Sequence, residues 1–227
     1  MPMRLSLQNC FVLLICLLAV CLQCGCNVAS TVAYITTPNP VMEARYELKD
    51  ESTVIFIDDR RSRVSPVRLR RTIGDVASEG ILKEELVVDV ISPRDATAAA
   101  RQLDKGPKPA AIGSVGKMVG ADQVIYVEMV EFRLLGPDGY TPDPYASCQV
   151  RVVDLVEKKR QFPDPEKSLS HTVEVRLPQQ KSLSVADSRA RQKLGELLAT
   201  ETGVQIARLF YDHEVPAVGA NLLYGDR

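Results

Sequence analysis

The sequence contains no tryptophan and only two histidines, His171 and His213, among its 227 residues. A histidine-rich metal centre or a hydrolase that uses a histidine base therefore has few residues to draw on. Five Phe and seven Tyr provide few rings for stacking bases or sugars. The net charge of -1 balances 28 basic against 29 acidic residues, so the chain lacks the basic field typical of nucleic-acid-binding proteins. We expect no metal, no cofactor and no nucleic acid.

Long hydrophobic runs are absent beyond the first 26 residues. Residues 10–22 form one apolar run of 13 residues, and Arg4 is the only charged residue in the segment 1–26. A permanent transmembrane helix needs about 20 such residues, whereas the core of a signal peptide is shorter. The sequence therefore predicts a signal peptide at residues 1–25.

Cysteine is nearly confined to the same segment. Five of the six cysteines lie there, namely Cys10, Cys16, Cys21, Cys24 and Cys26, and the sixth is Cys148. Gly25-Cys26, after the apolar run, resembles the lipobox of bacterial lipoprotein signals, in which the cysteine thiol receives diacylglycerol and becomes the new N-terminus. Gln23 and Cys24 depart from the usual residues, so lipidation at Cys21 or Cys24, ordinary cleavage nearby, and a thiolate cluster stay as alternatives. We predict that Cys26 is lipidated and attaches the protein to a membrane.

The rest of the chain alternates between strand and helix patterns. Residues 26–50 are polar, with a "TTPNP" turn cluster, and predict a tether. Strands are expected at 53–57, 85–91 and 123–134, and helices at 66–80, 95–103 and 110–119. Ser65-Pro66 and Ser92-Pro93 combine a capping serine with a proline, and Gly80 and Gly120 can end helices. This order predicts a parallel β-α-β-α-β half.

The C-terminal half follows a different pattern. Residues 145–155 alternate, with Ala146, Cys148, Val150 and Val152 on one face, and residues 169–177 alternate again. Two successive strands without a helix between them predict an added antiparallel hairpin. A capping pair, Ser184 and Asp187, opens a long helix that ends near Tyr211. We therefore predict one α/β domain at 51–211, with a mixed sheet of about five strands flanked by helices, and a tail at 212–227.

One basic cluster is a candidate binding site. Six arginines fall within 12 residues: Arg60, Arg61, Arg63, Arg68, Arg70 and Arg71. Such a cluster suits anionic lipid headgroups, an envelope polymer or an acidic protein. The alternative is a solvated helix face that Asp75 and Glu79 partly neutralise.

No catalytic residue is predicted. Asp58 and Asp59 end the first strand, where α/β proteins place ligands, but they are also natural turn partners for the arginines that follow. His171 shares the inward face of its strand with Leu169 and Val173, which favours a core histidine, and Cys148 is expected to be inert packing.

A phosphate-loop pattern is incomplete in this chain. The run "GSVGK" at 113–117 lacks the first glycine of that pattern and the hydroxyl residue after the lysine, because Ala111 and Met118 occupy those positions. The sequence therefore does not predict nucleotide binding.

Three segments carry a family resemblance: Gly25-Cys26, "STVIFIDD" at 52–59, and "IGSVGKMVGADQVIYVEM" at 112–129. With them the chain resembles a family of bacterial envelope lipoproteins. The family includes the curli-secretion lipoprotein, the lipoprotein activators of penicillin-binding proteins, and the N-terminal domain of the Tol-Pal translocation protein.

The resemblance implies a periplasmic binding or scaffold protein that acts through protein–protein contacts in envelope biogenesis or secretion, and not an enzyme. An envelope hydrolase using Asp58, Asp59 or His171, and a ring-forming homo-oligomeric subunit, are the alternatives. Asn27 lacks the acidic character associated with inner-membrane retention, which favours the outer membrane.

Overall fold

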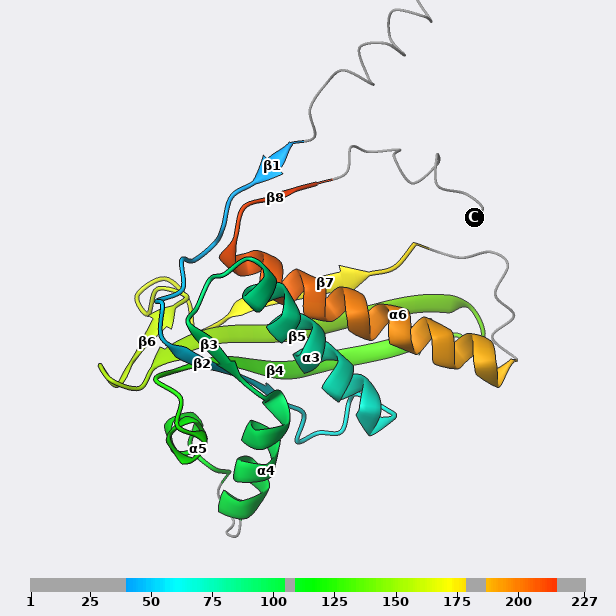
Figure 1. Ribbon diagram of the computed structural model, residues 1–227. Helices are drawn as coiled ribbons and strands as arrows, with labels where there is room; N and C mark the ends of the chain where they lie inside the picture. The colour runs from blue at the N-terminus through cyan, green and yellow to red at the C-terminus, as the bar shows by residue number, and fades with distance from the viewer. Residues whose placement is uncertain (1–39, 105–108, 179–186, 216–227) are drawn as a thin grey trace, which may run out of the picture. The chain divides into compact units, whose positions relative to one another are not determined.

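A mixed six-stranded sheet forms the centre of the computed structural model, which describes residues 40–104, 109–178 and 187–215 (Figure 1). Its strands are β2 (Ser52–Asp58), β3 (Asp89–Ile91), β4 (Gln123–Leu135), β5 (Pro142–Asp154), β6 (Lys159–Phe162) and β7 (His171–Arg176). The order is β3-β2-β4-β5-β6, and β7 also pairs with β5. β2 is parallel to β3 and β4, whereas all pairings of β5 are antiparallel. The predicted single α/β domain with a mixed sheet is confirmed.

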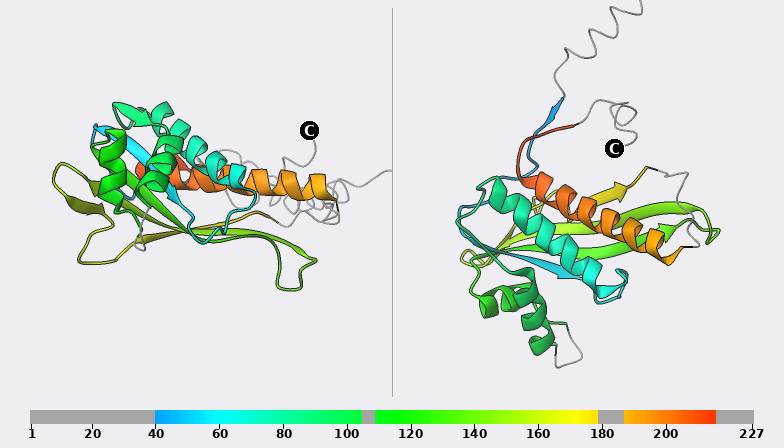
Figure 2. Two further views of the ribbon diagram at one scale, coloured as in Figure 1. Left: turned by 90° about the horizontal axis from the view of Figure 1, so that it is seen from below. Right: turned by 45° about the vertical axis from the view of Figure 1, so that its right-hand side comes forward.

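Four helices cover the sheet. They are α3 (Val67–Lys83), α4 (Pro93–Leu103), α5 (Ile112–Val119) and α6 (Ser188–Ala207), and a 3-10 turn, η1 (Arg208–Phe210), extends α6. α3 and α6 run side by side on one face, over a core that includes Ile55, Ile125 and Val150 (Figure 1). α4 and α5 cover the other face at its β2–β4 end, over Val54 and Val124. The long β4–β5 hairpin extends past α4 and α5 (Figure 2).

Several local signals act as expected. The Ser92 hydroxyl accepts a hydrogen bond from the Arg94 N–H, and Pro93 is the first residue of α4. Gly120 ends α5 in the left-handed conformation, with φ 79°. Asp187 caps α6 by accepting from the Arg189 N–H, while its predicted partner Ser184 lies outside the described residues. These devices depend on neighbouring residues alone, so the sequence reveals them. The same prediction at Ser65-Pro66 is wrong, because Pro66 precedes the first residue of α3 and no side chain caps that helix.

Gly80 does not end α3, which continues to Lys83. A Cβ at Gly80 would lie 2.8 Å from the Cβ of Ala207, so this glycine permits close packing against α6. Gly203 of α6 does the same from the other side, because its Cβ would lie 2.7 Å from the Ile73 carbonyl oxygen of α3. The two helices therefore approach each other through glycines.

The strands differ from expectation at three places. β3 has only three residues, and Glu85, where the predicted strand begins, lies before it with a positive φ of 52°. β6 was not predicted; it forms the hairpin with β5 that we expected residues 169–177 to form. Leu169 is 78% exposed and precedes β7, so the inward face of that strand begins at His171.

The compact unit that contains the main sheet runs from Glu43 to His213. It begins before the expected Glu51, because Leu48 is buried in the core and Lys49 forms ion pairs with Asp154 and Glu157, at 2.5 and 2.6 Å. A separate two-stranded sheet joins β1 (Val41–Met42) and β8 (His213–Glu214).

The predicted signal peptide, Cys26 and most of the predicted tether lie outside the described residues. Within the part of the chain that the structure describes, no helix has the length and apolar character needed to cross a membrane.

Gly203→Ala should destabilise the fold by about 1–3 kcal/mol, because the new methyl group meets a backbone carbonyl that cannot rotate away. Urea unfolding measures this loss. The control is Gly113→Ala in α5, whose Cβ meets nothing closer than 3.7 Å and which should gain up to about 1 kcal/mol from helix propensity. Equal stability of Gly203→Ala and the unmodified chain would contradict close α3–α6 packing.

Candidate functional site

Two buried aspartates lie at the carboxyl end of β2: Asp58 is its last residue and Asp59 follows it. The Asp59 carboxylate accepts hydrogen bonds from the N–H groups of Arg63, at 2.7 Å, and Val64, at 3.1 Å. Both aspartates are 5% exposed. Asp59 thereby folds the loop that leads from β2 into α3, and its predicted role as a turn residue is confirmed.

Asp58 is matched by two side-chain donors. The Arg60 guanidinium lies 2.6 Å from its Oδ2, and the Tyr126 hydroxyl donates to the same atom at 2.7 Å. Burial, and then this hydrogen bond, raise the pKa of Tyr126 above its ordinary value. The tyrosine therefore stays a neutral donor, and the predicted structural role of Asp58 as a partner for a nearby arginine is confirmed.

The six predicted arginines do not form one surface. Arg60 pairs with Asp58 and lies 3.6 Å from Asp104, and Arg68 pairs with Glu196 of α6 at 3.3 Å. The Arg61 and Arg63 side chains are exposed and have no ion-pair partner among the described residues. Arg70 and Arg71, in the first turns of α3, line one cavity together, and Arg60 lines a smaller one beside it.

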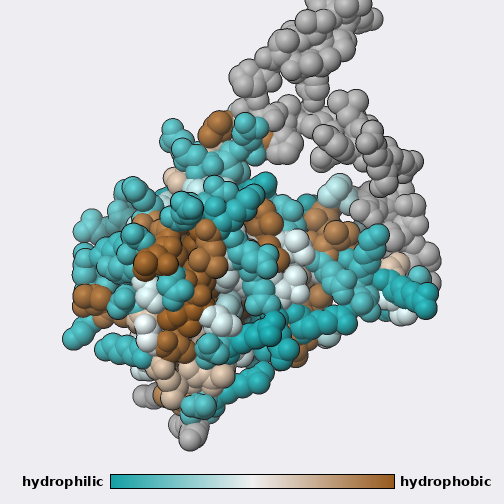
Figure 3. Space-filling view, viewed as in Figure 1, coloured by the Kyte–Doolittle hydropathy of each residue, from teal (hydrophilic) through white to brown (hydrophobic). Residues whose placement is uncertain are grey.

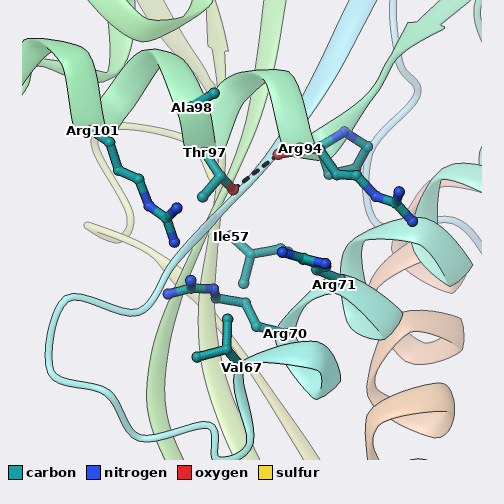
Figure 4. Close-up of a pocket in the computed structure, with 9 residues that line it drawn as sticks. Ile57, Val67, Arg70, Arg71, Arg94, Thr97, Ala98 and Arg101 are labelled. Carbon is teal, nitrogen blue, oxygen red and sulfur yellow. Dashed lines mark hydrogen bonds between the residues drawn. The ribbon is translucent and has the colours of Figure 1, made fainter.

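That cavity lies between α3 and α4, beside β2, and has a volume of about 310 Å³. Its lining, here called the arginine cavity, consists of Ile57, Val67, Arg70, Arg71, Pro93, Arg94, Thr97, Ala98 and Arg101. Figure 4 shows the guanidinium groups of Arg70, Arg71 and Arg101 extending into the space between the helices, in front of Ile57. Four arginines from two helices thus surround one small cavity.

Arg94 and Arg101 were missed by sequence reasoning. They lie seven residues apart in α4, so two helical turns place them on the same side, and this spacing was the available signal. Nothing local in the sequence indicates that this side of α4 faces Arg70 and Arg71. The cavity therefore depends on the packing of α3 and α4.

The charges of the arginine cavity are unevenly compensated. Arg94 pairs with Asp75 at 3.2 Å. Arg70, Arg71 and Arg101 have no carboxylate within 4 Å among the described residues. The Thr97 hydroxyl, which also lines the cavity, donates a hydrogen bond to the Pro93 carbonyl at 3.0 Å. The cavity therefore holds several positive charges that no described carboxylate neutralises.

A second, smaller cavity of about 100 Å³ adjoins it and shares Arg70, Thr97 and Arg101. Asp58, Asp59 and Asp104 line this space too. The first two carboxylates are already matched as described, and Asp104 accepts the Ala110 N–H at 2.6 Å. These acids moderate the positive field without pairing directly with the three arginines.

The other candidate catalytic groups lie elsewhere. His171 faces the α3–α6 side of the sheet, with its ring 5.3 Å from that of Phe162, whereas Asp58 meets Tyr126 on the α4–α5 side. Burial, and then the charge of Arg45, lower the pKa of His171. Asp58 and Asp59 line the smaller of the two cavities described above, and His171 lines neither of them.

Cys148 is fully buried, and burial raises the pKa of its thiol to about 12, so the thiol stays protonated and its predicted role as inert packing is confirmed. The run at 113–117 lies within α5, where a Cβ at Gly116 would meet Leu155 and Val124 at 2.5 Å. That glycine serves packing. Within the described ranges no group of three or more His, Cys, Asp or Glu residues is placed to hold a metal ion.

An exposed apolar surface surrounds the edge strand β3. Leu82 at the end of α3 is 47% exposed and Val88, just before β3, is 69% exposed; the half-buried Leu86 and Val90 adjoin them. Figure 3 shows hydrophobic side chains gathered over the end of α3, the following loop and β3. We call this set of four residues the β3 edge surface.

The face of the β4–β5 hairpin that α4 and α5 leave open is polar. Arg133 and Arg176 both stack on the Tyr145 ring, at 4.5 and 5.3 Å, and both pair with Asp143, at 2.7 and 2.9 Å. The hydrogen bond from Arg133 holds the pKa of Asp143 below its ordinary value. Arg133 also pairs with Glu131 at 2.6 Å, so two carboxylates balance the two guanidinium groups.

No protein-family model matches the sequence, and a search of curated proteins finds no match. Among solved structures, the fold is similar to the PelC dodecamer from Paraburkholderia phytofirmans, with 15% identity, a TM-score of 0.39, and coverage of 76% of this chain and 90% of that chain. Lipoprotein GNA1162 from Neisseria meningitidis is 14% identical, with a TM-score of 0.36 and coverage of 66% and 94%. The LpoB C-terminal domain from Escherichia coli is 12% identical, with a TM-score of 0.34 and coverage of 57% and 87%.

These identities and TM-scores mark a distant similarity in fold to bacterial envelope lipoproteins. TM-scores below 0.5 do not test the family resemblance seen in the sequence, which stays a prediction.

Tyr126→Phe should destabilise the protein by about 1–3 kcal/mol, because it removes a donor from the buried Asp58 carboxylate. Urea unfolding of the variant measures the change. Tyr140→Phe is the control, since Tyr140 is 84% exposed and its loss of a hydroxyl should stay within about 0.5 kcal/mol. A Tyr126→Phe variant as stable as the control would show that Arg60 alone satisfies Asp58.

Proposed function

We propose that this chain is a lipid-anchored envelope protein that binds another protein and performs no catalysis itself. The observation that carries the proposal is the β3 edge surface, an exposed apolar area beside a strand that pairs with β2 alone among the described strands. In such a role the lipid on Cys26 would hold the protein at the membrane. The predicted tether, residues 26–50, would set the distance between the membrane and the folded domain. Envelope biogenesis or secretion is the setting that the sequence resemblance implies.

β3 is suited to pair with a strand from a partner. In the main sheet it pairs with β2 alone, through Asp89, Val90 and Ile91. An edge strand presents N–H and C=O groups that an incoming strand can satisfy, and apolar side chains beside it add affinity. The exposed Leu82 and Val88 supply those side chains. Exposed apolar groups around a strand edge are a common feature of protein-binding surfaces.

An enzymatic role has less support. The residues proposed for an envelope hydrolase, Asp58, Asp59 and His171, are divided between two faces of the sheet. Both aspartates already have partners that fix the end of β2. A hydrolytic site requires an acid or base within reach of a shared substrate atom, and this arrangement does not supply one.

A photo-crosslinking amino acid in place of Val88 should give one discrete protein adduct in the native envelope, because β3 would lie within the interface. The control position is Leu169, which is 78% exposed and also apolar, but lies ahead of β7. Adducts are separated by mass and identified by mass spectrometry. Equal labelling from positions 88 and 169 would contradict the proposed surface, and an adduct of two copies of this chain would replace it with the ring-forming alternative.

Mass spectrometry of the mature N-terminus should find Cys26 as the first residue, carrying diacylglycerol. Cys26→Ala should release the protein from the membrane or stop its processing, while Cys21→Ala and Cys24→Ala should leave the mature N-terminus unchanged. Density-gradient separation of the two membranes should place the lipidated protein in the outer one. A mature chain that begins elsewhere or carries no lipid would contradict the anchor.

A further inference from the structure

We propose that the arginine cavity binds the phosphate group of a small ligand, either a free phosphate compound or a phospholipid headgroup. The inference rests on three guanidinium groups, those of Arg70, Arg71 and Arg101, that line one cavity without a carboxylate partner among the described residues. It concerns the start of α3, away from the β3 edge surface at its end, and does not depend on the proposed function.

The charge of the cavity favours phosphate over a single carboxylate. A guanidinium presents a planar fork of N–H donors that matches the oxygens of phosphate. A phosphate monoester carries a charge of about -1.5 to -2 at pH 7 and accepts through three oxygens, so it can engage several guanidinium groups at once. One carboxylate, with a single charge and two oxygens, would leave most of the three positive charges unmatched.

The position of the cavity also fits a ligand. β3 pairs with β2 only up to Val54, so no strand flanks Ile57 on that side, and the cavity occupies this place at the carboxyl end of β2. Ligands of α/β proteins bind at the carboxyl ends of parallel strands. Ligand cavities range from about 300 to 1,000 Å³, so about 310 Å³ accommodates a small molecule.

The apolar residues in the lining of the cavity indicate an apolar part of the ligand next to its phosphate group. Ile57, Val67 and Pro93 supply apolar surface beside the arginines. A phosphate joined to a short organic portion would place its charge on the guanidinium groups and its apolar part on these side chains. The amide of Arg94 is already used by the Ser92 hydroxyl, so the donors for phosphate come from arginine side chains and not from the start of α4.

The acids nearest the cavity are engaged with other groups. Asp58 is matched by Arg60 and Tyr126, Asp59 by the loop that follows it, and Asp75 by Arg94. None lies within ion-pair distance of Arg70, Arg71 or Arg101. An incoming phosphate therefore gains three donors without displacing an existing ion pair.

The test is calorimetric titration of the full-length chain in a nonionic detergent. The probes are inorganic pyrophosphate, dioctanoyl phosphatidic acid and dioctanoylglycerol. The proposal expects saturable binding of at least one phosphate probe and none of dioctanoylglycerol. Tighter binding of pyrophosphate would identify a free phosphate compound as the ligand, and tighter binding of phosphatidic acid a lipid headgroup. Absence of binding by both phosphate probes overturns the proposal.

Matched variants distinguish binding in the arginine cavity from a general electrostatic attraction of phosphate to the protein. R71Q/R101Q should weaken binding by at least about tenfold, because each guanidinium contributes charge-assisted hydrogen bonds. R61Q/R63Q removes the same charge from exposed arginines outside the cavity and should change binding by less than about twofold. R71K/R101K keeps the charge but removes the planar fork, so it should bind more weakly than the unmodified chain. Equal weakening by R71Q/R101Q and R61Q/R63Q, in chains with unchanged thermal unfolding, overturns the proposal.

Discussion

The burial of β2 on both faces is the constraint on which the structure depends. Its residues from Thr53 to Asp58 are all buried, and it lies between β3 and β4 with parallel pairing on each side. A strand of this kind needs a helical layer on each face, because its side chains alternate between the two cores. The connections through α3 and α4 supply those layers, and they bring the two helices together beside Ile57.

The short length of β3 links the two proposed surfaces. Because β3 pairs with only the first residues of β2, the rest of that edge is unoccupied by a strand. The arginine cavity fills one part of this space, and the exposed side chains of Leu82 and Val88 lie beside the strand itself. Asp59 binds two N–H groups of the loop that leads into α3, the helix that carries Arg70 and Arg71. A local backbone feature, the positive φ of Glu85, accompanies the late start of β3.

Much of the fold could be predicted because its signals are local. Alternation in β4 and β5, the Ser92-Pro93 start of α4 and the Gly120 end of α5 are all visible over a few residues. The misleading features involve contacts between distant segments. Gly80 has the sequence signature of a helix end, yet its role is to admit Ala207 of α6, and no local pattern contains that information. β6 is short and partly exposed, so its alternation is too brief to distinguish from a loop.

By itself, the sequence determined the α/β class, the order of the principal elements, the structural roles of Asp58 and Asp59, and the inert character of Cys148. Only the tertiary structure decided which arginines act together. Arg60 and Arg68 pair with acids, whereas Arg70 and Arg71 meet Arg94 and Arg101 from another helix. The reason is physical: helix and strand patterns follow from side-chain periodicity along the chain, but the charge at a site depends on distances across space, which packing alone sets.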